Sequence, residues 1–221
     1  MRKQAVSRSL SRFPLVLLFC LCAHAAALAD PITYAVAVNT SLLSGQNGYL
    51  NFQFNPGGAG AMSATANIGS FALNGTLTGA PERLGGASGT LPVVALTNSG
   101  QLNDYFQGVR FGTGFTFMLT LSGPAVDNPG GSIGSVFSVS LFGADQTTPL
   151  LTLDPSGALG MLLLNPGSAV TTVSFPLSGG GGTAITFTRQ GGEIPEPATL
   201  ALLGTGLAGM MLRNRRRRVS G

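Results

Sequence analysis

The side chains that most often carry out chemistry are concentrated at the start of this chain. Both cysteines, Cys20 and Cys22, and the one histidine, His24, fall within the first 24 residues of a 221-residue sequence. Residues 30–193 therefore contain no thiol nucleophile, no imidazole base and no Cys/His metal site. Serine and threonine are plentiful there, but lysine is absent, so no ordinary base is present to activate a hydroxyl group.

Carboxylates are the remaining groups that could act. A glycoside hydrolase needs only two of them, and Ca²⁺ prefers oxygen ligands of the kind that Asp104, Asp127, Asp145 and Asp154 would supply. The chain has no EF-hand spacing and no Asp-rich repeat, and most of its acids stand beside turn residues, as Asp154 does before Pro155. We therefore expect no catalytic residue, no metal site and no cofactor, and we predict that the protein is not an enzyme.

The C-terminal tail has three distinct parts. The triplet Pro195, Glu196 and Pro197 comes first, an uncharged apolar run over residues 198–212 follows, and the basic residues Arg213, Arg215, Arg216, Arg217 and Arg218 come last. A helix over that apolar run would be roughly 22 Å long, against a hydrocarbon core of about 30 Å. We predict a short membrane segment, with the arginines as a membrane stop that stays on the cytoplasmic side.

This tail resembles the PEP-CTERM sorting signal of Gram-negative bacteria. The resemblance covers residues 195–218 and rests on the triplet, the apolar run and the arginines. It implies that the protein is a substrate of exosortase, a membrane cysteine transpeptidase or protease that is thought to cut near the triplet. The two prolines also disfavour a helix at the residues before them, so Glu196 should stand on an extended segment as a fixed charge for recognition. The alternative is an ordinary tail anchor whose prolines only begin the helix.

The N-terminus has the pattern of a secretory signal peptide. Positive charges come first (Arg2, Lys3, Arg8 and Arg12), an apolar stretch spans residues 15–21, and Ala27 and Ala29 form an A-x-A cleavage site. We predict a signal peptide over residues 1–29 and export by the general secretion machinery.

The basic residues of the two ends hide the charge of the part between them. The whole chain has a net charge of +4, but residues 30–193 contain three basic and seven acidic residues, a net charge of −4. Nucleic-acid binding requires clustered Lys and Arg on one face, and this part has only Arg83, Arg110 and Arg189. We therefore exclude a nucleic-acid partner.

Residues 30–189 show the sequence pattern of an all-β domain. Apolar residues alternate with polar ones in several short runs, which places one side chain in the core and the next in water. Asn51, Thr116 and Ser140 are among the polar residues predicted to face water. The predicted core includes Phe52, Phe54, Phe117, Leu119, Phe137, Val139 and Phe187. Many short strands between Gly, Pro, Asn and Asp residues favour a single β-sandwich or jelly-roll-like ectodomain, joined by a linker over residues 190–194 to the sorting signal.

Three turns are predicted from proline and glycine. Asn55-Pro56-Gly57 and Asn165-Pro166-Gly167 have the residue order of a type II turn, and the four residues 154–157 have that of a type I turn. The stretch 49–58, YLNFQFNPGG, also resembles one that recurs in a subgroup of PEP-CTERM ectodomains, and it implies no known activity.

Two functions fit these observations. The first is a non-enzymatic surface or extracellular-matrix protein, associated with exopolysaccharide or biofilm, that crosses the inner membrane, is held there transiently and then reaches the cell surface or the medium. The second is a β-sandwich module that binds a glycan or a protein. Against glycan binding, the chain has no Trp, only three tyrosines (Tyr34, Tyr49 and Tyr105), and phenylalanines that are predicted to face the core.

Overall fold

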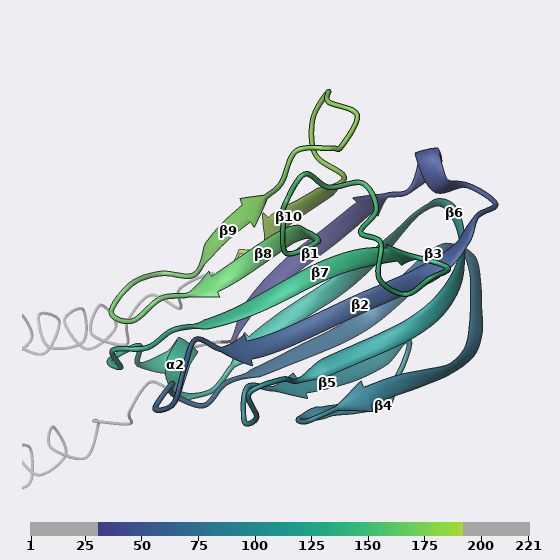
Figure 1. Cartoon of the computed structure of the whole chain (residues 1–221). Coiled ribbons are helices and arrows are strands. Elements are labelled where there is room, and N and C mark those ends of the chain that lie inside the picture. The colour runs from purple at the N-terminus through teal and green to yellow at the C-terminus, as the bar shows by residue number, and fades with distance from the viewer. Residues whose placement is uncertain (1–30, 192–221) are drawn as a thin grey trace, which may run out of the picture.

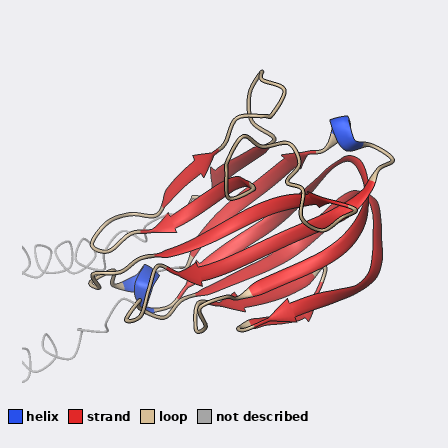
Figure 2. Cartoon of the chain, viewed as in Figure 1, coloured by secondary structure: helices blue, strands red, loops and turns tan. Residues whose placement is uncertain are grey.

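The computed structural model describes residues 31–191, and these form an all-β domain (Figures 1 and 2). The sheet contains ten strands, all in antiparallel pairs. Their bounds are β1 (Ile32–Asn39), β2 (Asn47–Pro56), β3 (Thr65–Leu84), β4 (Ala87–Thr90), β5 (Val93–Thr97), β6 (Asp104–Ser122), β7 (Ser135–Gly143), β8 (Ala158–Leu164), β9 (Thr171–Ser174) and β10 (Ile185–Arg189). Two short helical turns, η1 (Ser41–Leu43) and α2 (Pro124–Asp127), lie in the connections.

Two long strands, β3 and β6, join the two halves of the sheet. They are 20 and 19 residues long and pair with each other at 15 positions. The register shifts at three places, between Gly69 and Ala72, between Asn74 and Gly75, and between Thr78 and Glu82. Such irregularities bend a strand and increase its local twist. On its other side, β6 pairs first with β2 and then, beyond the bend, with β1.

The sheet therefore forms two layers that share β3 and β6. One layer continues from the first half of β6 into β2, β7, β8 and β9. The other layer contains the second half of β6 and the first half of β3. In this layer β6 continues into β1 and β10, and β3 continues into β5 and β4. Figure 1 shows β2, β7, β8 and β9 side by side in front of β1 and β10. The layers face each other, because the Phe52 ring of β2 meets the Phe117 ring of β6 edge to face at 5.1 Å. The all-β prediction is confirmed as one large antiparallel sheet, rather than two separate sheets.

Side-chain alternation places the predicted core residues between the layers. Phe52, Phe54, Phe117, Leu119, Phe137 and Val139 are buried, and Phe187 is half-buried against them. Thr116, which follows Phe115 in β6, is exposed as predicted.

The predicted exposure was wrong at two positions on the outer side of the sheet. Asn51 and Ser140 were expected to face water, but they are only 1% and 5% exposed. They are register partners on β2 and β7, and both lie on the outer side of the sheet.

Two of the three predicted turns are confirmed. Gly167 has a φ of 66° and Ser168 N–H donates to the Asn165 carbonyl at 3.4 Å, while Gly157 N–H donates to the Asp154 carbonyl at 2.9 Å. The turn predicted at Asn55-Pro56-Gly57 is wrong, because Pro56 continues β2 and pairs with Ser135, and Gly57 does not have a positive φ. Proline is tolerated there because β2 pairs with β6 only as far as Gln53, so that side of β2 is an unpaired edge at Pro56.

Candidate functional site

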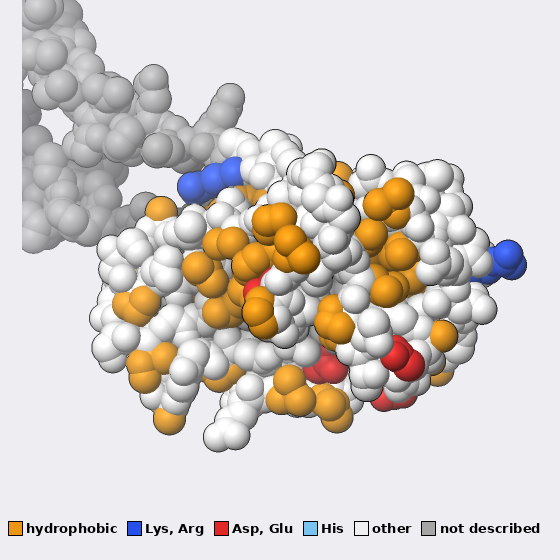
Figure 3. All heavy atoms as spheres, turned by 45° about the horizontal axis from the view of Figure 1, so that its top comes forward, with side chains coloured by type: hydrophobic (Ala, Val, Ile, Leu, Met, Phe, Trp, Pro, Cys, Tyr) orange, Lys and Arg blue, Asp and Glu red, His pale blue; other side chains and the backbone are white. Residues whose placement is uncertain are grey.

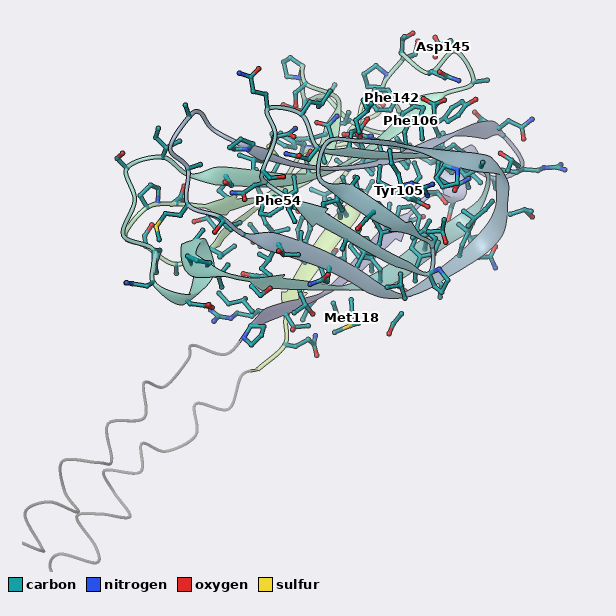
Figure 4. The ribbon with its side chains drawn as sticks, turned by 90° about the horizontal axis from the view of Figure 1, so that it is seen from below. Phe54, Tyr105, Phe106, Met118, Phe142 and Asp145 are labelled. Carbon is teal, nitrogen blue, oxygen red and sulfur yellow. The ribbon has the colours of Figure 1, made fainter. Side chains whose placement is uncertain are left out.

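Three aromatic rings lie together on the outer side of the sheet, away from the core. Tyr49 of β2 stacks on Phe106 of β6 with ring centroids 4.7 Å apart and an interplanar angle of 13°, and Phe106 lies 5.9 Å from the ring of Phe142 in β7. All three side chains are partly exposed. Figure 4 shows Phe106 and Phe142 on one side of the domain, Phe54 and Tyr105 in the interior, and Met118 on the opposite side.

Strand register brings these rings together. Tyr49 is the register partner of Phe142 in β7 and of Gly108 in β6. Phe106 is in turn the partner of Asn51, two residues along β2 from Tyr49. The five residues Tyr49, Asn51, Asp104, Phe106 and Phe142 are called the aromatic surface below.

A buried polar pair belongs to this surface. Asn51 Nδ2 donates to Asp104 Oδ1, and also to the Tyr105 carbonyl at 3.4 Å. Among the described residues, Asn51 Oδ1 is a buried side-chain acceptor without a hydrogen-bond partner. Burial raises the pKa of the Asp104 carboxyl, an effect that the Asn51 hydrogen bond opposes and the nearby Glu82 carboxylate adds to. The surface therefore combines aromatic rings with an unsatisfied acceptor and a carboxylate.

The loop between β7 and β8 borders the aromatic surface. Gln146 Nε2 donates to the Tyr49 hydroxyl at 2.9 Å, and the Gln146 backbone has a φ of 65°. Asp145 Oδ1 accepts from the backbone N–H groups of Thr147 and Thr148, at 3.1 and 3.0 Å, and its other oxygen accepts from the Thr148 hydroxyl. These hydrogen bonds lower the pKa of Asp145 to about 2, and the hydrogen bond from the Thr148 hydroxyl contributes most to this shift. The Asp145 carboxylate thus shapes the turn that places Gln146 against Tyr49.

The four aspartates that could have bound a cation have separate roles. Asp104 contacts Asn51, Asp145 organises its loop, and the Asp154 carboxylate accepts hydrogen bonds from Ser156 Oγ and from Ala158 N–H at 3.2 Å. Asp127 is exposed at the end of α2. Within residues 31–191, no three Asp, Glu, His or Cys side chains are grouped as a metal site would require.

Two concavities lie elsewhere on the domain. One, of about 690 Å³, is lined on the outer side of β1, β3, β6 and β10 by small and uncharged residues such as Asn39, Asn74 and Thr186. The other, of about 410 Å³, lies between residues 56–61 and 98–101 and is lined largely by glycine and small polar residues. No carboxylate, and no other group that could exchange a proton near neutral pH, lines either one.

The sorting residues predicted from the sequence lie outside the described part of the chain. This applies to the signal cleavage site at Ala27 and Ala29, to the triplet Pro195, Glu196 and Pro197, to the membrane segment 198–212, and to Arg213, Arg215, Arg216, Arg217 and Arg218. Within residues 31–191, no helix is long and apolar enough to span a membrane.

Comparison with protein families gives a match at this end of the chain. Residues 193–217 match the model of the PEP-CTERM protein-sorting motif. The chain carries a PEP-CTERM sorting motif. This motif implies an exported, cell-surface-associated protein that is processed by exosortase. No match was found among curated proteins or among solved structures.

The PEP-CTERM motif was predicted from the sequence, whereas the aromatic surface was not. The phenylalanines were all expected to face the core, but Phe106 and Phe142 face outwards. A signal was present, because Tyr105-Phe106 and Leu141-Phe142 are pairs of consecutive large apolar residues within strands. Consecutive residues of a strand point to opposite sides of the sheet, so one member of each pair must lie on the outer side.

Proposed function

We propose that this chain is a non-enzymatic surface or extracellular-matrix protein that reaches the outside of the cell through its PEP-CTERM motif and exosortase. The motif at residues 193–217 is the observation that carries this proposal. An ectodomain without cysteine or lysine and with a net charge of −4 is consistent with a matrix environment rather than a catalytic one. The proposed partners are exosortase, the general secretion machinery and, at the destination, exopolysaccharide or biofilm material.

The distribution of acidic groups supports a non-enzymatic role. Glycoside hydrolysis needs two carboxyl groups that face each other across the scissile bond, about 5–9.5 Å apart. Asp104 and the exposed Glu82 are close enough to interact electrostatically, but neither lines one of the two concavities. Neither of these two concavities therefore brings together the two carboxyl groups that such a reaction needs.

Replacing one charge in the triplet tests the sorting proposal. Glu196→Ala removes the one charged side chain between the two prolines, and we expect this variant to accumulate in the inner-membrane fraction. Glu193→Ala is the matched control, because it removes an acidic residue inside the matched region but outside the triplet. Immunoblotting of inner-membrane, surface and medium fractions measures the outcome. Normal release of the Glu196→Ala variant would contradict the proposal.

A second candidate function is an extracellular module that binds a glycan or a protein. The aromatic surface favours it, because partly exposed rings in mutual contact are common in recognition surfaces and are not needed for solubility. The proposed sandwich or jelly-roll-like arrangement of the domain would leave this outer side accessible.

A further inference from the structure

We propose that the aromatic surface is a binding site for an uncharged polysaccharide. This inference rests on the proposed function only in that the domain must reach the outside of the cell, where such polymers are found. Three features of the site support it: the rings, the unsatisfied polar group and the charge.

The rings provide apolar area in the form that a sugar can use. A pyranose ring has faces made largely of C–H groups, and these pack on aromatic faces through dispersion and weak C–H···π contacts. Tyr49, Phe106 and Phe142 come from three adjacent strands, and the Phe106 ring lies next to both of the others. The Tyr49–Phe106 contact holds two of these rings nearly parallel.

The polar groups between the rings match hydroxyl groups. Asn51 Oδ1 lacks a partner, and an unsatisfied buried acceptor costs about 1–3 kcal/mol. A hydroxyl group is a donor that would satisfy it once the adjoining rings shift to admit the ligand. Asp104 supplies a further acceptor on the same face, and the carboxamide of Gln146 lies at the edge beside Tyr49. This set of acceptors and amides suits a ligand that is rich in hydroxyl groups.

The charge of the surface selects against acidic polymers. Asp104 belongs to the surface, and Asp145 in the bordering loop is ionised at neutral pH because its pKa is about 2. The basic residue on the same side of β6, Arg110, pairs with Asn47, two residues before Tyr49 in β2, and directs its Nε–H towards the Gly45 carbonyl at 3.3 Å. In the view of Figure 3, few side chains are charged, and most are hydrophobic or uncharged. A neutral chain avoids the repulsion that a uronic-acid polymer would meet.

Affinity electrophoresis of the full-length chain in detergent micelles tests the site. The probes are laminarin, dextran, mannan, the neutral polysaccharide fraction from the producing organism's own medium, and alginate as an acidic control. We expect at least one neutral probe to retard the protein and alginate to have no effect. Phe106→Ala should weaken binding at least tenfold, whereas Met118→Ala, on the opposite side of the domain, should change it less than twofold.

A conservative variant separates binding from folding. Tyr49→Phe keeps the ring and removes only the hydroxyl group that Gln146 contacts, so it should bind within about threefold of the natural chain. Circular dichroism of each variant shows whether the sheet is intact. The proposal would be overturned if Phe106→Ala kept its binding, or if Phe106→Ala and Met118→Ala lost binding equally. It would also be overturned if the protein preferred alginate, or if it bound a protein but no neutral probe.

The two proposals fail in different ways. A protein that is released normally but binds no neutral polysaccharide would overturn the ligand assignment and leave the sorting proposal intact. A chain that binds a neutral polysaccharide yet is never released from the inner membrane would overturn the sorting proposal and leave the ligand assignment intact.

Discussion

Phe117 shows how a single side chain joins the two layers of this domain. It is 2% exposed, contacts Phe52 of the opposite layer edge to face, and stacks on Phe115 along its own strand. Removing a buried phenylalanine side chain loses both its transfer free energy and the packing around the cavity that remains. The contribution of Phe117 to stability should therefore be large.

Phe117→Ala should lower the free energy of unfolding by about 3–5 kcal/mol. Thr116→Ala is the matched control, because Thr116 is adjacent in β6 and exposed, and it should change stability by no more than roughly 0.5 kcal/mol. Urea titration followed by circular dichroism measures both values. Similar losses in the two variants would show that β6 does not separate core from solvent at this position.

Asp104 should make the stability of the domain depend on pH. Its pKa is raised, chiefly by burial, so the folded domain holds the proton more tightly than the unfolded chain does. The resulting stabilisation is complete below the unfolded pKa near 3.8, and it is lost as the pH rises through the higher folded value.

Asp104→Asn removes this titration while it keeps an acceptor oxygen for Asn51. Relative to the natural chain, the variant should become more stable as the pH rises from about 3 to 7. Urea unfolding across that range gives the difference in free energy. A difference that stays constant with pH would contradict the assignment of a raised pKa to this carboxyl.

The residues of the aromatic surface mark the limit of what alternation can predict. Alternation assigned Phe52 and Phe54 of β2 correctly, because every second residue must face the core. It also assigned Asn51 to the outer side, but the period of a strand does not show what covers that side. Asn51 is covered because its strand is paired with β6 and β7, whose residues are far from β2 in the sequence. The pattern of residues within β2 therefore cannot predict that Asn51 is buried.

At the scale of elements, the bend in β3 and β6 determines the architecture. The register shifts in this pair coincide with glycines, including Gly69, Gly75 and Gly112. A Cβ atom at Gly112 would lie 1.7 Å from the Asn74 carbonyl oxygen, whereas one at Gly69 would have nothing within 4 Å. The two strands can approach this closely at the bend only because Gly112 has no side chain.

Gly112→Ala should therefore weaken the pairing of β3 with β6 at the bend and destabilise the domain by roughly 1–3 kcal/mol or more. Gly69→Ala should be neutral, or stabilising by up to about 1 kcal/mol, because its backbone is outside the left-handed region and the unfolded chain loses freedom. Thermal unfolding compares the two variants. A Gly112→Ala variant as stable as Gly69→Ala would contradict the close approach of β3 to β6 at Gly112.

The long strands also explain why the sequence predicted the fold class but not the single sheet. Short alternating runs indicate strands, and they were interpreted as separate elements of a sandwich. The residues of β3 beyond its first few positions are mostly exposed and lack a sustained alternation, so a strand of 20 residues is not apparent there. Its length is set by pairing with β6, whose own pattern is clear in both halves.

At the scale of the whole molecule, the chain combines an acidic domain with a sorting motif that ends in arginines. The domain has no cysteine, so its stability rests on the packed core between the layers rather than on disulfides. The motif at residues 193–217 follows within a few residues of β10, which ends at Arg189. Little chain therefore separates the folded domain from the site of processing.

This arrangement predicts two cleavages, one near Ala29 and one near Pro197. The first follows from the signal-peptide pattern and the second from the PEP-CTERM motif, and together they remove both basic ends. The product should be an acidic protein of about 165–170 residues that keeps the whole described domain. Intact mass spectrometry of extracellular material determines both ends directly. Recovery of most of the protein with Arg213 and the following arginines still attached would show that the motif anchors the chain without being processed.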